Sequence, residues 1–265
     1  MGPDGGSVGS PEGVLEAAGE AARLVDASSR IAVLTGAGIS TDSGIPDFRG
    51  PDGIWTRNPE AEKASDIRYY VSDPEIRRQR WALRASGELW PDVAPNAGHR
   101  ALVHLERRGM LDTLVTQNVD GLHQAAGSDP DSIVEIHGTT RRAMCLDCEW
   151  RDDIEVVLER VRAGDADPRC GLCGGLLKSA TVSFGQSLFP GDVERIEQAA
   201  VSCDLVLAVG TSLSVYPVAA MVPLAARHGA GVVIVNGEPT AMDDLADVVV
   251  MGSISEVLGI VVGSR

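Results

Sequence analysis

The sequence predicts an α/β fold: a Rossmann-like doubly wound parallel sheet with a smaller insertion domain. Short, nearly continuous apolar segments alternate with amphipathic segments of helical period, which is typical of parallel strands covered on both faces. Polar clusters follow the apolar segments, where parallel sheets bind ligands. Residues 51–95 and 139–181 lose this alternation and predict the insertion domain, with a helical part and a four-cysteine zinc ribbon.

Composition and charge bound the class of protein. The chain of 265 residues is long enough for one large domain with an insertion, and its hydrophobic fraction of 44% is that of a globular protein. The net charge of -15 disfavours nucleic acid and anionic membranes as partners and is compatible with a basic protein substrate. An acidic surface that only aids solubility is the alternative. We expect a monomer or weak oligomer.

The first residues and the cysteines bear on location. Residues 1–12 are rich in Gly, Pro and Ser and lack the order of a secretion signal, so we expect a disordered tail. No apolar stretch reaches the roughly 18 residues that span a bilayer. These patterns predict a cytoplasmic protein, in which the five cysteines are thiols or metal ligands and not disulfides.

Hydrophobic periodicity places the elements in order. A helix is expected over 14–27, and Asn96 is a suitable N-cap for a helix that Gly109 ends. Further helices are expected over 152–163, over 215–228 and after Ser253. Strands are expected over 31–34, 111–116, 133–136, 205–209, 232–235 and 248–250. Residues 13–50, 96–138 and 182–265 are assigned to the Rossmann-like domain, and 51–95 and 139–181 to the small domain.

The first strand runs into a glycine loop, Gly36-Ala37-Gly38-Ile39-Ser40. A glycine turn after a strand offers backbone amides to a pyrophosphate, and side chains there would keep the backbone from approaching it. The dinucleotide fingerprint of dehydrogenases places glycines at offsets 0, 2 and 5. Here they stand at 36, 38 and 44, so the loop disfavours hydride transfer. A tight strand–helix connection without a ligand is the alternative.

Four more polar clusters follow predicted strands: residues 117–120, 137–138, 210–212 and 236–238. The carboxyl ends of parallel strands share one edge of a sheet, so we expect these loops and the glycine loop to form one site.

The cysteines form two C-x-x-C pairs, Cys145 with Cys148 and Cys170 with Cys173, at a spacing that predicts a structural four-thiolate zinc site. Redox dithiols or unrelated thiols are the alternatives. Four protein ligands leave no open position for water, so the metal is expected to fold the insertion and not to catalyse. Cys203 is expected to be a buried thiol.

Together these motifs, in this order from about residue 31 to 258, closely resemble the sirtuins, the NAD-dependent protein lysine deacylases. The resemblance implies that acyl-lysine and NAD meet in a cleft between the domains. Nicotinamide leaves, and the acyl group passes to ADP-ribose. An imidazole is a suitable general base for the ribose hydroxyl at neutral pH, and His137 is the candidate. His99 and His123 lack that context and are interpreted as structural.

The resemblance also assigns the remaining roles. Asn118 and Asp120 join His137 as catalytic residues. NAD would be bound by Gly36, Ala37, Gly38, Ser40, Asp47, Phe48, Arg49, Gln117, Asn118, Asp120, Gly210, Thr211, Ser212, Asn236, Gly237, Glu238 and Ser253. The substrate would be bound by Val182, Phe184, Gly185, Trp81 and Arg84, and zinc by Cys145, Cys148, Cys170 and Cys173.

Two stretches depart from the common sirtuin pattern. Residues 178–186 read KSATVSFGQ, without the usual proline and with Gln186 in place of an acid. Desuccinylase-type members carry Tyr-x-x-Arg in the helical insertion, and here Trp81 stands in place of the tyrosine, with Arg84 three residues on. We therefore favour neutral acyl groups such as acetyl over longer or acidic ones.

Three other functions compete with deacylation. Protein mono-ADP-ribosyl transfer shares the NAD chemistry but does not need the base His137. A non-catalytic nucleotide-binding module leaves the many polar residues at one sheet edge unexplained. A dehydrogenase is disfavoured by the glycine spacing.

Overall fold

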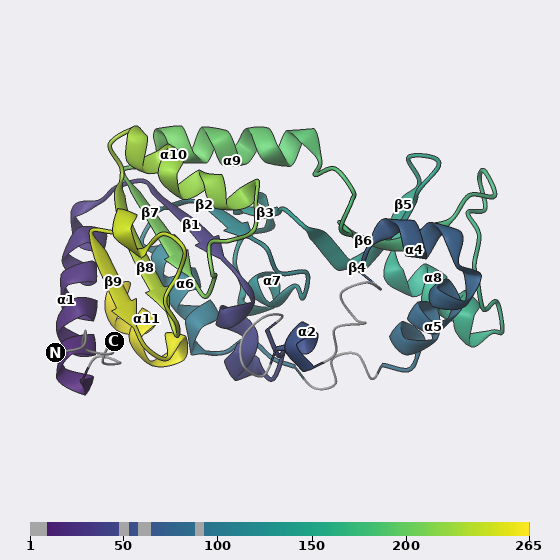
Figure 1. The fold of residues 1–265 in the computed structure, drawn as a ribbon, viewed down its shortest axis with the longest axis horizontal. Coiled ribbons are helices and arrows are strands. Elements are labelled where there is room, and N and C mark those ends of the chain that lie inside the picture. Colours follow the sequence, from purple (N-terminus) through teal and green to yellow (C-terminus); the bar gives the residue numbers. More distant parts are fainter. Residues whose placement is uncertain (1–9, 48–52, 58–64, 88–92, 265) are drawn as a thin grey trace, which may run out of the picture.

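The computed structural model describes residues 10–47, 53–57, 65–87 and 93–264. The molecule is elongated and has two lobes (Figure 1). The larger lobe holds a six-stranded sheet and the smaller a three-stranded sheet. The predicted fold class is confirmed. The division into domains at residues 51–95 and 139–181 stays a prediction.

The large sheet has the strand order β3-β2-β1-β7-β8-β9, and every pair in it is parallel. Its strands are β1 (Ile31–Thr35), β2 (Leu111–Thr116), β3 (Ile133–Glu135), β7 (Leu205–Val209), β8 (Gly231–Asn236) and β9 (Val248–Met251). Thr35 pairs with both Thr116 and Val209, so the loops after three strands leave from one edge. From β1 the chain adds β2 and β3 on one side, and from β7 it adds β8 and β9 on the other. The point between β1 and β7 is therefore the switch point of the sheet, which is where such sheets bind ligands.

Helices cover both faces of this sheet (Figure 1). The helices α1 (Pro11–Ala27), α6 (Ala97–Arg107) and α11 (Ile254–Val261) pack on one face through a core that includes Ala21, Leu102 and Leu258. The helices α9 (Pro190–Ser202) and α10 (Met221–Arg227) pack on the other. Strands β1 and β7 are buried along their whole length, which explains why they are apolar apart from Thr35 at the end of β1.

Three helix boundaries differ from the prediction. Helix α1 begins at Pro11 because the Ser10 side chain accepts a hydrogen bond from the Gly13 N–H, so residues 11 and 12 are helical and not part of a disordered tail. Residues 215–217 are not helical, and a short 3-10 turn precedes α10. Helix α8 (Ile154–Arg162) begins two residues late, because Arg151–Asp153 forms strand β5. The caps Asn96 and Gly109 are confirmed.

The smaller lobe joins two distant stretches of chain. Its helices α4 (Ile67–Ser72), α5 (Pro74–Ala85) and α8 lie beside the sheet of β4 (Gly138–Cys145), β5 and β6 (Leu177–Thr181) (Figure 1). Arg77 of α5, only 3% exposed, forms an ion pair with Asp167 at 2.8 Å. The Tyr70 hydroxyl donates to the Leu177 carbonyl at 2.6 Å. These contacts fasten the helical insertion to the cysteine-bearing one.

The remaining described helices are short: α2 (Ile54–Arg57) and α7 (Leu122–Ala126), with 3-10 turns η1 (Ala37–Ser43), η2 (Pro130–Ser132), η3 (Val218–Ala220) and η4 (Asp243–Leu245). Over the described residues, every helix is too short or too polar to cross a bilayer.

Candidate active site

A cavity of about 1350 Å³ is lined by residues of both lobes. The larger lobe contributes the loops after β1, β2, β7 and β8, as expected from the shared sheet edge. The smaller lobe contributes one face of α5 and residues from the end of β6 onward. The cavity therefore unites polar loops that are far apart in sequence.

Most residues assigned to the site line this cavity. They are Gly36, Ala37, Gly38, Ser40, Asp47, Arg84, Gln117, Asn118, Asp120, His137, Val182, Phe184, Gly185, Gly210, Thr211, Ser212, Asn236, Gly237, Glu238 and Ser253. Phe48 and Arg49 lie outside the described residues. Trp81 does not line the cavity: it is 1% exposed and packs in the core of the smaller lobe, so the prediction that it contacts substrate is wrong.

The glycines of the glycine loop pack against the backbone at Gly210, whereas the sequence predicts a pyrophosphate against them. A Cβ added at Gly36 would lie 2.7 Å from the Gly210 carbonyl oxygen, and one at Gly38 would lie 2.8 Å from the Gly210 Cα. The absence of side chains therefore lets the loops after β1 and β7 pack backbone to backbone. The Gly38 N–H donates to the Gly210 carbonyl at 2.9 Å, which fixes this contact.

A polar network lies against the glycine loop. The Ser40 hydroxyl donates to the Asp120 carboxylate at 2.8 Å. The Asn118 amide donates to Ser40 Oγ and to the Gly36 carbonyl, each at 3.1 Å. Burial raises the pKa of Asp120 above its usual value, while hydrogen bonds from Leu122 and Ser40 oppose the shift. The network holds an amide and a carboxyl at fixed positions on the cavity wall.

His137 follows β3 and lines the same cavity. Its Nδ1 lies 3.0 Å from the Gln117 carbonyl oxygen. A carbonyl only accepts, so Nδ1 carries the proton and the neutral ring keeps Nε2 as its basic nitrogen. Burial lowers the pKa of His137, so the neutral form dominates at neutral pH. The arrangement is that of a general base oriented by a backbone carbonyl.

A pair of histidines is buried beside this network. His99 of α6 is 0% exposed, and His123 of α7 is 1% exposed. Their ring centroids are 5.0 Å apart. His99 Nε2 is 3.5 Å from Ser40 Oγ, and His123 Nε2 is 3.0 Å from Thr35 Oγ1. The expectation that both are structural agrees with their burial, but the sequence did not indicate that they touch the ends of the glycine loop.

The α5 side of the cavity is cationic. Arg84 and Arg80, one helical turn apart, both line it with Leu83. Burial, and then the charge of Arg80, lower the pKa of Arg84 to about 10. Lys178 of β6 is 2% exposed and donates through Nζ to the Thr181 carbonyl. Burial and the two arginines lower the pKa of Lys178 to about 7. Arg80 and Lys178 were not singled out by the sequence.

The segment expected to pair with a peptide already has partners inside the chain. The Phe184 N–H donates to the Ser65 carbonyl at 3.0 Å, and the Phe184 carbonyl accepts from the Ile67 N–H at 2.9 Å. Gln186, which stands where an acid is usual, accepts from the Ser183 N–H through its side chain at 2.9 Å. Pairing of a peptide with Val182, Phe184 and Gly185 stays a prediction.

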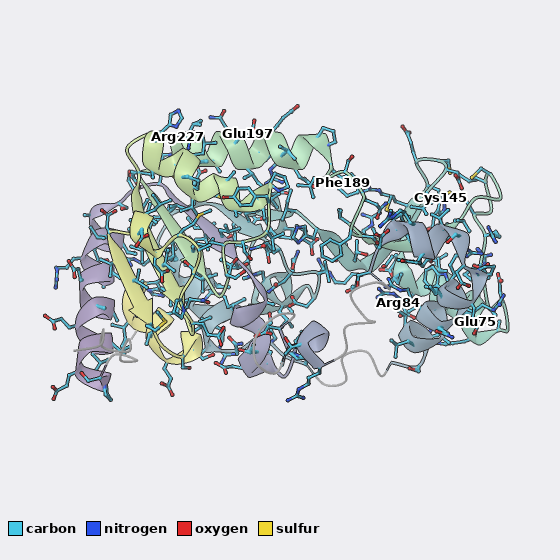
Figure 2. All side chains as sticks on the ribbon, viewed as in Figure 1. Glu75, Arg84, Cys145, Phe189, Glu197 and Arg227 are labelled. Carbon is cyan, nitrogen blue, oxygen red and sulfur yellow. The ribbon has the colours of Figure 1, made fainter. Side chains whose placement is uncertain are left out.

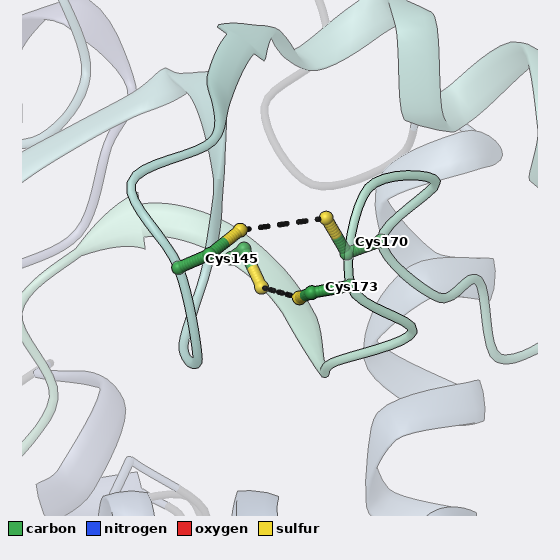
Figure 3. A group of neighbouring side chains, drawn as sticks. Cys145, Cys170 and Cys173 are labelled. Atoms are coloured by element: carbon green, nitrogen blue, oxygen red, sulfur yellow. Dashed lines mark hydrogen bonds between the residues drawn. The ribbon is translucent and has the colours of Figure 1, made fainter.

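The four cysteines converge in the smaller lobe (Figure 3), and Figure 2 shows Cys145 in the same lobe as Arg84. All four sulfurs lie within 4.8 Å of one another, with Cys145 and Cys173 3.5 Å apart and Cys148 and Cys170 3.7 Å apart. Tetrahedral zinc with Zn–S bonds of about 2.3 Å places its sulfurs roughly 3.8 Å apart, so the group fits zinc. The Asp147 and Gly175 N–H groups donate to Cys145 and Cys173, which stabilises thiolates. The predicted zinc ligands are thus brought together.

Known proteins are similar to this chain in sequence and in overall fold. Residues 36–217 match the model of the Sir2 family. The chain is 50% identical over 230 residues to NAD-dependent protein deacetylase 2 of Streptomyces coelicolor, covering 86% of this chain and 94% of that protein. It is 40% identical to NAD-dependent protein deacetylase 1 of Bradyrhizobium diazoefficiens, covering 91% and 93%.

Solved structures agree. A Sir2 enzyme structure superposes with a TM-score of 0.82 at 37% identity, covering 94% of this chain and 97% of that one. A Sir2 complex with p53 peptide and NAD+ gives a TM-score of 0.78 at 32% identity, covering 91% and 95%. The family match over residues 36–217 spans the glycine loop, His137 and the cysteine group together. This chain belongs to the Sir2 family.

Proposed function

We propose that this protein is an NAD-dependent protein lysine deacylase that transfers the acyl group to ADP-ribose and releases nicotinamide. The observation that carries the proposal is His137, a base oriented by the Gln117 carbonyl, in one cavity with the glycine loop and the loop after β7. Relatives and solved structures named as NAD-dependent deacetylases and Sir2–NAD+ complexes support it.

The chain's own residues divide into two functions. The glycine loop, Gln117, the loop over 210–212 and residues 236–238 would hold NAD. They line the cavity with polar groups at the switch point of the sheet, where parallel sheets of this kind bind nucleotides. Asn118 and Asp120 would stabilise the positive charge that develops at the ribose carbon. Bound NAD supplies a glycosidic bond to a cationic leaving group.

His137 would act after that bond breaks. Once the acyl oxygen has bonded to the ribose carbon that nicotinamide left, its Nε2 would accept the proton of a ribose hydroxyl, whose oxygen would bond to the acyl carbon. The bond from the acyl carbon to the lysine nitrogen would then break and the lysine amine would leave. Water would add to the acyl carbon and release the first ribose oxygen, so that the acyl group remains as an ester of ADP-ribose. The α5 face would contact the acyl chain, and Arg80, Leu83 and Arg84 are among its cavity-lining residues. We propose acetyl as the preferred group. An acyl group ending in a carboxylate is the alternative that Arg84 favours.

The test is nicotinamide release from NAD with acetyl-lysine peptide, compared with deacylation of the same peptide. One nicotinamide for each acyl group removed is expected. His137→Ala should lower deacylation about 100-fold or more, the scale of general-base catalysis. Exchange of labelled nicotinamide should survive in this variant, since the base acts later. His228→Ala, at an exposed helix end, is the matched control. Full deacylation by His137→Ala would remove His137 from the mechanism.

Location and assembly are also proposals. A cytoplasmic location would keep the cysteines reduced, and a monomer or weak oligomer would leave both lobes accessible to an acylated protein. Light scattering and cell fractionation test these two points.

A further inference from the structure

The histidine pair of α6 and α7 is buried and has no anionic partner among the described residues. Burial lowers the pKa of His99 to about 4, aided by Arg100, and that of His123 to about 3, aided by His99. Both rings are therefore neutral at physiological pH, and they act by hydrogen bonding and contact, not by charge.

His123 has one polar contact in the described structure. Its Nε2 lies 3.0 Å from the hydroxyl of Thr35, the last residue of β1, which is itself 0% exposed. Its Nδ1 is buried with no hydrogen-bond partner among the described residues. A phenyl ring would fill the same space without leaving a polar atom unsatisfied, a state that buried groups rarely show. The feature that distinguishes the imidazole here is its bond to Thr35.

Thr35 directly precedes the glycine loop, and its position determines where the loop begins. Its carbonyl accepts from the Gln117 N–H at 3.0 Å, and the next carbonyl, of Gly36, accepts from the Asn118 amide at 3.1 Å. A shift of Thr35 would therefore move both polar residues after β2. Misplacing binding groups by a fraction of an ångström is enough to weaken a site that depends on several of them.

His123 also reaches the far end of the loop. Its ring packs against the ring of His99 at 5.0 Å, and His99 contacts the Ser40 hydroxyl. The same Ser40 donates to Asp120. One buried side chain thus supports Thr35 directly and Ser40 through His99.

We propose that His123 is a positioning residue that holds the glycine loop, residues 36–40, in the geometry that binds the ADP-ribose part of NAD. This role rests on the proposed NAD-dependent function. It predicts that the hydrogen bond, and not the volume of the ring, determines cofactor affinity.

The experiment compares His123→Phe, which keeps a ring and loses the bond, with His123→Gln, whose side-chain amide can donate to the Thr35 hydroxyl or accept from it. Calorimetry with ADP-ribose measures binding without turnover. We expect His123→Phe to weaken ADP-ribose binding and raise the KM for NAD by about five- to tenfold, the scale of one buried hydrogen bond. The KM for acetyl-peptide should change less than about twofold. His123→Gln should recover most of the affinity, and His104→Phe on α6 should behave as wild type.

Two results would overturn the role. Wild-type affinity for ADP-ribose in His123→Phe would show that the bond is dispensable. Equal losses in His123→Phe and His123→Gln, with equal falls in Tm, would show that only packing matters. If the wild type binds ADP-ribose but releases no nicotinamide with any acyl-peptide, the proposed function fails while the calorimetric comparison still decides the role of His123.

Discussion

The buried histidine pair predicts a specific loss of stability in acid. His99 and His123 are neutral in the folded protein, with pKa values of about 4 and 3 against 6.5 when exposed. A basic group with a depressed folded pKa is protonated more readily in the unfolded chain. Stability is therefore full above pH 6.5 and falls as the pH drops below it.

The magnitude follows from the exposed pKa alone. At pH 5 both rings are still neutral in the folded protein but are mostly protonated in the unfolded chain. This pH lies about 1.5 units below the exposed pKa, and each unit costs roughly 1.36 kcal/mol. Each histidine therefore lowers the free energy of unfolding by about 2 kcal/mol. The pair together should lower the free energy of unfolding by about 4 kcal/mol between pH 8 and pH 5, a large part of the 5–15 kcal/mol of a typical domain. Buried carboxyls and His137 add their own dependence, which a variant comparison removes.

Urea unfolding followed by circular dichroism at pH 8, 6.5 and 5, with excess zinc, measures this slope. His123→Phe removes one titrating ring, so its loss between pH 8 and pH 5 should be about 2 kcal/mol smaller than that of wild type. His228→Phe, at an exposed position, should keep the wild-type slope. An unchanged slope in His123→Phe would refute the claim that the ring is buried and neutral.

Three further predictions concern the smaller lobe. Cys173→Ser, or a strong chelator, should release zinc and unfold this lobe, since a structural zinc contributes folding free energy directly. Metal content and protease sensitivity measure the two effects, and a lobe that stays folded without metal would contradict the prediction. Asp167→Asn leaves Arg77 buried without its anion and should lower the free energy of unfolding by about 3 kcal/mol. Asp165→Asn, which breaks the exposed ion pair with Arg160, should lower it by less than about 1 kcal/mol in the same unfolding assay. Arg84→Leu should raise the KM for succinyl-lysine peptide about tenfold if a carboxylate meets this side chain, and an unchanged ratio of succinyl to acetyl activity would place the acyl end elsewhere.

The central sheet was predictable because its strands are buried on both faces. β7 is apolar throughout and β1 is apolar up to Thr35, its last residue, and Gly109 marks the end of α6 with a left-handed backbone. The three-stranded sheet could not be predicted in the same way. β6 contains Lys178 and Ser179, which are buried in spite of their polarity, so neither alternation nor an apolar run marks the strand. Its stability comes from pairing with β4, more than 30 residues earlier in the chain.

The same limit applies to the cavity wall on α5. The spacing placed Trp81 and Arg84 on one helix but did not say which side faces the cavity. The apolar Trp81 packs inward, and Arg77 is buried as well because Asp167 and two backbone carbonyls receive its guanidinium. Arg84 and Arg80 remain for the cavity. A sequence-based interpretation that places every charge at the surface fails wherever a buried partner exists.

The glycine spacing, which disagrees with the dehydrogenase fingerprint, follows from the local fold. In that fingerprint the third glycine lets an α-helix pack closely on the first strand. Here the chain forms η1, a 3-10 turn that begins at Ala37 within the loop, so no glycine is needed at that offset. Gly44 instead ends η1 in the left-handed region, with φ of 90°. Gly36 and Gly38 are required by their contact with Gly210, whose own Cβ would lie 2.4 Å from the Ile39 nitrogen. The loops after β1 and β7 thus pack backbone to backbone, and His123 contacts Thr35 directly before the first of them.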